Sequence, residues 1–222
     1  MYVTGRLLSS DGTLCDEAWV AVETGTVTGV GEGSVPSDAD SVVTADLLLP
    51  GFVGYHSGPV DSAAAERLLA AGVTHVVGPT DGCDGIVSVR PKSPPQLLRS
   101  RELVGATGPD RSVYDGPTVV DLAAGTPTSV VRETTVTDGC GFSDEETTVP
   151  EFLYGVMVGR AVAGVPGVAS GSPAALVAAQ TDLPPTAPPH DATGYAVYGL
   201  TEAEVTAVVT PTGVYRPRGE AA

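Results

Sequence analysis

Apolar and polar residues alternate over short runs in the first fifty residues, which is the pattern of half-buried β-strands. Thr24-Gly25 joins two of these runs in the manner of a β-hairpin. The predicted strands are Tyr2–Leu8, Ala18–Glu23, Thr26–Val30 and Ser41–Leu49. The chain therefore begins with a strand-rich unit.

The pattern changes after Pro50-Gly51, where two short apolar runs flank a stretch rich in alanine and leucine. The elements are strand Phe52–Tyr55, helix Ala63–Ala71 with Asp61 or Ser62 as N-cap and Gly72 at its end, and strand Val73–Val77. A strand, helix and strand in this order form a βαβ unit, which predicts a parallel sheet.

The rest of the chain is rich in glycine and proline, and its pattern is mixed. We expect strands at Gly85–Val89, Thr118–Leu122 and Val130–Thr137, and helices at Pro95–Leu103, Pro150–Ala163 and Pro173–Gln180. A proline-rich linker, 182–190, precedes the strands Gly194–Tyr198, Glu204–Val209 and Val214–Arg216. Both ends of the chain are thus strand-rich and could pair in one small sheet.

The charge of the chain is strongly negative. The 222 residues include 27 acidic and 11 basic side chains, which gives a formal net charge of −16. Lys92 is the only lysine. This balance argues against nucleic acid as a partner, because few basic groups are present to neutralise phosphates. An acidic chain almost without lysine resembles the proteins of halophiles that keep molar salt in the cell, where the Debye length shrinks to about 3 Å.

Other sequence features exclude further classes of protein. No apolar run approaches the roughly 20 residues of a membrane helix, and no secretion signal opens the sequence, so we expect a cytoplasmic protein without membrane contact. Cys15, Cys83 and Cys140 are too few and too scattered for a disulfide framework. Cys83 and Cys140 lie in similar Asp-Gly-Cys turns, and whether they pair stays open. A neighbouring carboxylate raises the pKa of a thiol, which argues against either cysteine as a nucleophile.

Four segments, in this order along the chain, resemble the amidohydrolase superfamily of metal-dependent hydrolases. They are Leu48–His56 (LLPGFVGYH), similar to the start of the first barrel strand, Leu69–Thr74 (LAAGVT), similar to the second, Thr135–Gly139 (TVTDG), similar to the last, and Ala169–Ala174 (ASGSPA), similar to the helix after the barrel. Tyr195–Val197 and Val205–Tyr215 resemble the closing strands of the family.

The resemblance implies an α/β fold in which a composite β-sandwich, built from both chain ends, accompanies a (β/α) barrel. A complete barrel takes about 250 residues, and the stretch from Pro50 to Gln180 has room for about four units rather than eight. We therefore expect an incomplete barrel or an open parallel sheet. The implied domains are 1–49 with 191–222 as the β domain and 50–181 as the truncated βα domain, joined by the linker 182–190. Open sheet edges need cover, which predicts either a homodimer or a sheet covered by loops.

The resemblance also implies a reaction, the hydrolysis of a C–N bond of a small molecule by metal-activated water. His56 and Asp138 are the implied ligands of a divalent metal (Zn, Mn or Fe), and Asp138 is also the implied catalytic residue. A hydrolytic metal site needs about three protein ligands. Asp81, Asp84 or His190 would have to supply the third.

Several positions depart from the family pattern. Gly54 stands where the family has an aspartate, and Gly58 stands where it has a second histidine. Only Lys92 could provide a bridging lysine, and the two mid-barrel histidines have no counterpart, because His75 is predicted to be a core residue of its strand. The alternative function is therefore that of a catalytically inactive relative, which serves as a binding or subunit-interaction scaffold.

Overall fold

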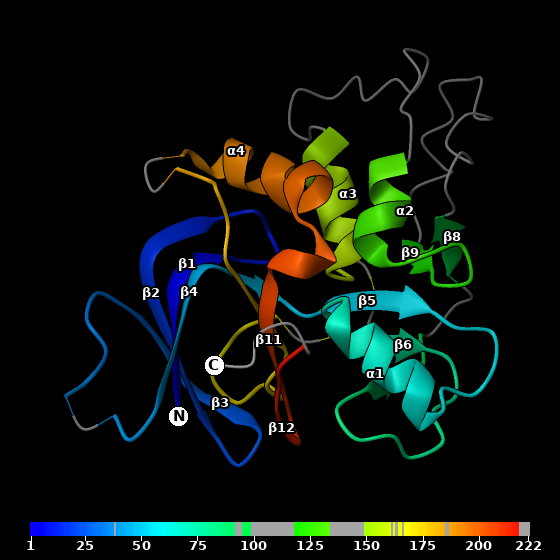
Figure 1. Cartoon of the computed structure of the whole chain (residues 1–222), viewed down its shortest axis with the longest axis horizontal. Coiled ribbons are helices and arrows are strands. Elements are labelled where there is room, and N and C mark those ends of the chain that lie inside the picture. Colours follow the sequence, from blue (N-terminus) through cyan, green and yellow to red (C-terminus); the bar gives the residue numbers. More distant parts are fainter. Residues whose placement is uncertain are drawn as a thin grey trace.

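The computed structural model describes the chain except for residues 38, 92–94, 99–117, 134–148, 161, 163, 166, 185–186 and 218–222. The described residues form a mixed α/β fold with two sheets (Figure 1). This confirms the fold class predicted from the sequence.

The larger sheet has seven strands and takes them from both ends of the chain. Its strands are β1 (Tyr2–Leu8), β2 (Leu14–Glu23), β3 (Thr26–Glu32), β4 (Val42–Pro50), β10 (Leu176–Ala179), β11 (Val205–Thr210) and β12 (Gly213–Tyr215). Their order is β12-β11-β10-β4-β1-β2-β3, so β4 lies between an early strand and a late one. β4 pairs in parallel with β1 and antiparallel with β10. The strands of the two chain ends are thus joined at the β4–β10 pair.

The smaller sheet has five strands, and every pairing between them is parallel. Its strands are β5 (Phe52–Tyr55), β6 (Val73–Val77), β7 (Val87–Val89), β8 (Gln96–Leu98) and β9 (Thr118–Asp121), in the order β7-β6-β5-β9-β8. β5 is the central strand, and within the described residues the two outer strands, β7 and β8, are not joined into a closed barrel.

The first βαβ unit forms for the reasons visible in the sequence. Helix α1 (Ser62–Ala70) begins at Asp61, whose carboxylate accepts a hydrogen bond of 2.7 Å from the N–H of Ala64. Gly72 follows the helix with a φ of +79°, and a Cβ at this position would lie 2.9 Å from the Phe52 ring. Glycine is therefore required at this helix end both by its backbone conformation and by close packing.

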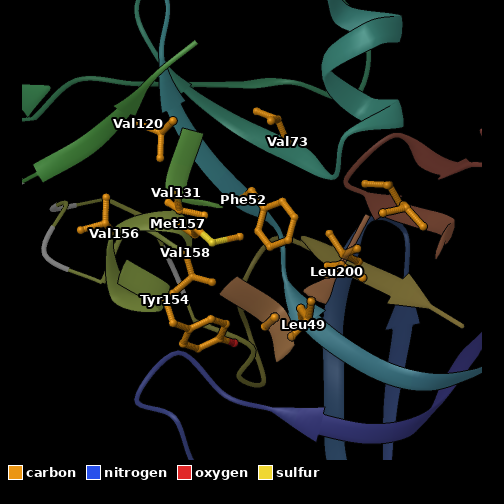
Figure 2. Close-up of a cluster of buried hydrophobic side chains, with 14 of the residues drawn as sticks. Leu49, Phe52, Val73, Val120, Val131, Tyr154, Val156, Met157, Val158 and Leu200 are labelled. Carbon is orange, nitrogen blue, oxygen red and sulfur yellow. The ribbon is translucent and has the colours of Figure 1, made fainter. Parts of the chain in front are cut away.

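The main core lies between the two sheets and the helices α1, α2 (Pro127–Glu133) and α3 (Val149–Met157). Figure 2 shows Phe52 of β5 surrounded by side chains that include Leu49, Met157 and Leu200. Tyr154 of α3 is fully enclosed, and its hydroxyl donates a 2.9 Å hydrogen bond to the carbonyl of Leu8. This bond joins α3 to β1. It also satisfies the buried hydroxyl, which would destabilise the fold if it had no partner.

A separate cluster covers the second face of the parallel sheet. Val53, Val77, Val89 and Val119 point to this face and pack with Val162, which follows α3. Gly159 lies so close to β5 that a Cβ would be 2.7 Å from the Val53 side chain. The chain after α3 thus covers part of this second face.

Several elements differ from the sequence-based prediction. Residues 130–133 of the predicted strand Val130–Thr137 belong to α2, and residues 134–137 lie outside the described part. The predicted helix Pro173–Gln180 contains β10. The predicted strand Gly194–Tyr198 coincides with the end of α4 (Pro189–Gly194) and with a π-helix at Tyr195–Gly199. Gln96–Leu98, expected within a helix, forms β8, and residues 99–103 are not described. These runs are short and apolar, and periodicity alone does not separate a buried strand from a buried helix of such length.

The division into domains stays a prediction. β10 falls inside the range 50–181 that was assigned to the barrel-derived domain, yet it pairs with β4 and β11 in the seven-stranded sheet. Residues 189–199 of the linker and of the C-terminal range are helical.

Candidate functional site at the carboxyl edge of the parallel sheet

The carboxyl ends of β5, β6 and β9 meet at one edge of the parallel sheet. In open α/β sheets this edge is where ligands bind. Tyr55 at the end of β5 pairs with Asp121 at the end of β9. His56 comes directly after β5, and its N–H donates a 3.2 Å hydrogen bond to the carbonyl of Val77 in β6. At this edge Asp121 therefore ends β9, and His56 follows the neighbouring strand β5.

The His56 imidazole is held in one tautomer. It is half-buried, and its Nδ1 lies 2.7 Å from the carbonyl oxygen of Gly58. A carbonyl oxygen only accepts hydrogen bonds, so Nδ1 must carry the proton. In the neutral ring, Nε2 then has the free lone pair, which is the usual state of a histidine that binds a metal through Nε2.

Asp121 is the acidic residue that the sequence analysis missed. Its side chain is buried, with 6% of its surface exposed, and one carboxylate oxygen accepts a 3.1 Å hydrogen bond from the N–H of Ala123. β9 lies beside β5, which is the place that the last strand of a closed barrel takes next to the first. The signal was present in the sequence, because the predicted strand Thr118–Leu122 carries one acidic residue near its end. Asp138, to which the resemblance gave this role, lies outside the described residues, and its part in metal binding or catalysis stays a prediction.

Gly54 and Gly58, the two glycines that depart from the family pattern, have opposite surroundings. A Cβ at Gly54 would lie 2.5 Å from Cγ of Leu122. The side chain of Leu122 therefore takes the space that an aspartate at position 54 would need. A Cβ at Gly58 would have no atom within 4 Å, so that position is open.

The described residues do not fit a complete hydrolytic metal site. His56 and Asp121 are two candidate ligands, whereas such a site takes about three from the protein. Within the described ranges, no three His, Cys, Asp or Glu side chains come together as a metal site would require. Asp81 and Asp84 are exposed in the loop after β6, and His190 belongs to α4, which packs against α3 and β1.

His75 is a core residue, as predicted. Its side chain is 1% exposed, and its Nδ1 lies 2.8 Å from the hydroxyl of Thr74. Burial lowers the pKa of His75 to about 4, so that the ring is neutral at pH 7.

Cys83 has a structural contact. Its thiol donates a 2.6 Å hydrogen bond to the carbonyl of Val60, which joins the loop after β6 to the start of α1. Cys140 lies outside the described residues, so the question of its pairing with Cys83 is unchanged.

Throughout the described part of the chain, no helix has both the length and the apolar character that crossing a bilayer demands.

Comparison with known proteins gives a likeness at the level of the fold. No family model matches the chain, and no curated protein matches it either. Guanine deaminase from E. coli has a similar structure, with a TM-score of 0.61 at 9% identity over 98% of this chain and 99% of that chain. N-acetyl-D-glucosamine-6-phosphate deacetylase from Mycobacterium smegmatis matches 35% of this chain with 28% identity and a TM-score of 0.29, and L-hydantoinase from Arthrobacter aurescens matches 35% with 22% identity and a TM-score of 0.30.

The likeness to guanine deaminase extends over almost the whole chain and supports a general amidohydrolase-like fold. The match spans only 26% of the length of the deacetylase and 20% of the hydantoinase.

Proposed function

We propose that this chain is a catalytically inactive amidohydrolase-like protein that serves as a binding scaffold. The observation that carries the proposal is the packing of Leu122 against Gly54. In the resembling family, position 54 holds an acidic side chain at the first strand. Here the backbone of β5 and the Leu122 side chain close that space, and Gly58 adds no imidazole. Among the described residues, the carboxyl edge offers His56 and Asp121 as candidate donors, which is fewer than the roughly three that a hydrolytic metal site takes.

A second candidate function rests on His56 and Asp121. The Nδ1 contact with Gly58 leaves Nε2 as the ligand atom, and Asp121 adds a buried carboxylate on the neighbouring strand. If a further ligand completes this pair, a divalent ion there would activate water, and the chain would hydrolyse a C–N bond of a small molecule. In that case His56 and Asp121 would hold the ion.

Metal analysis of the full chain, purified without chelators, separates the two functions. For the scaffold we expect no stoichiometric Zn, Mn or Fe by mass spectrometry. We also expect no turnover of N-acetyl-D-glucosamine-6-phosphate, a hydantoin or guanine, the compounds after which the structural neighbours are named. Full chain with His56→Ala and with Glu66→Gln should have the same metal content as the wild type.

The opposite result is equally definite. One equivalent of metal per chain that is lost in His56→Ala and in Asp121→Asn, but kept in Glu66→Gln, would overturn the scaffold function and establish the hydrolytic site. Glu66 is an exposed residue of α1 and a suitable control for loss of a polar side chain.

A further inference from the structure

Two adjoining hollows lie along the segment that leads from β10 to α4. The first has a volume of about 710 Å³ and includes Arg6 of β1 in its lining. The second has a volume of about 570 Å³ and reaches Tyr195 at the start of the π-helix. Leu183 and Pro184 line both hollows, so the two share a wall. We call the pair the linker groove.

Arg6 fixes the shared wall. Its side chain is 8% exposed, and its guanidinium donates hydrogen bonds to the carbonyls of Pro184, at 2.8 Å, and Ala187. A third hydrogen bond of 3.1 Å joins Nε to the Asp16 carboxylate. Two of these bonds hold Pro184 and Ala187 against β1, and the third joins Arg6 to β2, so this wall of the groove is formed without a ligand. A preformed groove loses less conformational entropy on binding.

Tyr195 is fixed at the other end of the groove. The backbone changes there from α-helix to π-helix, and the N–H of Leu200 donates a 2.8 Å bond to the Tyr195 carbonyl. The ring packs so closely over Gly199 that a Cβ there would lie 2.7 Å from it, and the hydroxyl donates to Glu204. Burial, and then the Glu204 carboxylate, raise the pKa of Tyr195 to about 12, so this hydrogen bond persists at neutral pH. π-helical turns are rare and frequently occur at functional sites.

The two hollows differ in chemistry. The second is mainly apolar, with one acidic residue, Asp191, beside Leu183, Pro184, Ala187, Pro188, Gly194 and Tyr195 in its lining. The first carries four carboxylates, from Asp16, Glu17, Asp46 and Asp182. Its one basic group, the Arg6 guanidinium, is already committed to Asp16 and to backbone carbonyls.

We propose that the linker groove docks a basic segment of another protein. One apolar side chain of the segment packs on Tyr195 and the prolines, and neighbouring Arg or Lys side chains lie beside the four carboxylates. A free cation would use only the acidic hollow and leave the apolar one empty. A second copy of this chain is disfavoured by its own net charge of −16. The inference rests on the proposed scaffold function and names the kind of partner that the scaffold holds.

A labelled peptide tests the groove. The probe is an eight-residue peptide with a central Leu-Pro pair, two arginines on either side and a glycine at each end. Its binding to the full chain is measured by fluorescence anisotropy, at the lowest salt concentration at which circular dichroism shows the wild-type fold. We expect Glu17→Lys/Asp182→Lys to weaken binding at least tenfold. The control Glu23→Lys/Glu66→Lys changes the net charge equally at exposed residues that do not line the groove, and it should weaken binding less than twofold. Replacing the leucine of the peptide by serine should weaken binding about tenfold.

Three results would overturn the proposal. Equal loss of peptide binding in the control variant and the groove variant would mean a diffuse response to net charge. Equal binding of the serine peptide and the leucine peptide would mean that the apolar hollow is not used. Sedimentation of the wild type as a dimer that the groove variant dissociates would make a second copy the occupant. Peptide binding by a metal-containing, active protein would instead overturn the scaffold function and leave the groove intact.

Discussion

Glycines 54 and 58 lie four positions apart, and the structure gives them opposite tolerance to a side chain. The first packs against Leu122, whereas the second faces open space without a left-handed backbone. The sequence alone marks both positions as departures from the family pattern. It does not tell which of them the fold has closed, because Leu122 follows β9, which is distant in sequence from Gly54.

Alanine substitutions measure this difference. We expect Gly54→Ala to lower the free energy of unfolding by about 1–3 kcal/mol, because the added methyl group overpacks against Leu122. Gly58→Ala should be neutral or stabilise by up to about 1 kcal/mol, since it restricts the unfolded chain without a clash. Urea denaturation gives both values. The double variant Gly54→Ala/Leu122→Ala should cost less than the sum of its single variants, and simple additivity would contradict the packing.

Burial of His75 makes the fold sensitive to acid. The folded-state pKa is about 4 against an ordinary value of about 6.5, so the unfolded chain binds the proton more tightly. The stability that depends on the neutral ring is complete above pH 6.5 and is lost as the pH falls towards 4. We expect a loss of about 3 kcal/mol over this window from His75 alone.

The measurement compares denaturation of the wild type and His75→Leu at several pH values. The carboxylates contribute to both curves, so the difference between the slopes isolates His75. Parallel curves between pH 6.5 and 4 would show that the ring is not buried as described.

At the scale of elements, predictions from sequence succeeded where a pattern met a turn or cap signal. This is true of β1, β5, α1 and β6. The last three form the βαβ unit, which was predicted with its parallel pairing. β10 and the π-helix were missed because their valine and alanine runs carry no period that separates a strand from a helix. The residues at the candidate site likewise depend on which strands are neighbours in the sheet, and periodicity does not reveal this. Asp121 lies at the end of the strand beside β5 because β9 pairs with β5, and this pairing joins residues far apart in the chain.

The sequence left two N-caps open for α1, and the structure selects one. The Asp61 carboxylate accepts the N–H of Ala64. We therefore expect Asp61→Ala to lower the free energy of unfolding by about 1 kcal/mol. Ser62→Ala, one position further along, should change it by less than about 0.5 kcal/mol. Thermal or urea unfolding of the two variants checks this, and an equal loss in both would show that the cap is shared.

At the scale of the whole molecule, charge is the dominant feature. With 27 acidic and 11 basic side chains, repulsion opposes compaction at low salt. If the acidic surface is an adaptation to molar salt, the midpoint of thermal unfolding should rise between tens of millimolar and 2 M NaCl. Each kcal/mol of relieved repulsion corresponds to a rise of about 2–4 °C for a chain of this size.

The salt dependence is measured by thermal melts followed by circular dichroism. The variant Glu23→Lys/Glu66→Lys, with a smaller net charge, should show a smaller rise. A midpoint that is the same at both salt concentrations would mean that the acidic surface has no such role.

The joining of β4 to β10 sets a condition on synthesis of the chain. β4 has its parallel neighbour as soon as the first fifty residues have left the ribosome, but its other neighbour begins at Leu176. Until then the β4 edge has an unpaired backbone beside buried leucines, the kind of surface on which nascent chains aggregate. Completion of the larger sheet must therefore wait for translation of most of the message, and pairing across so long a separation is slow.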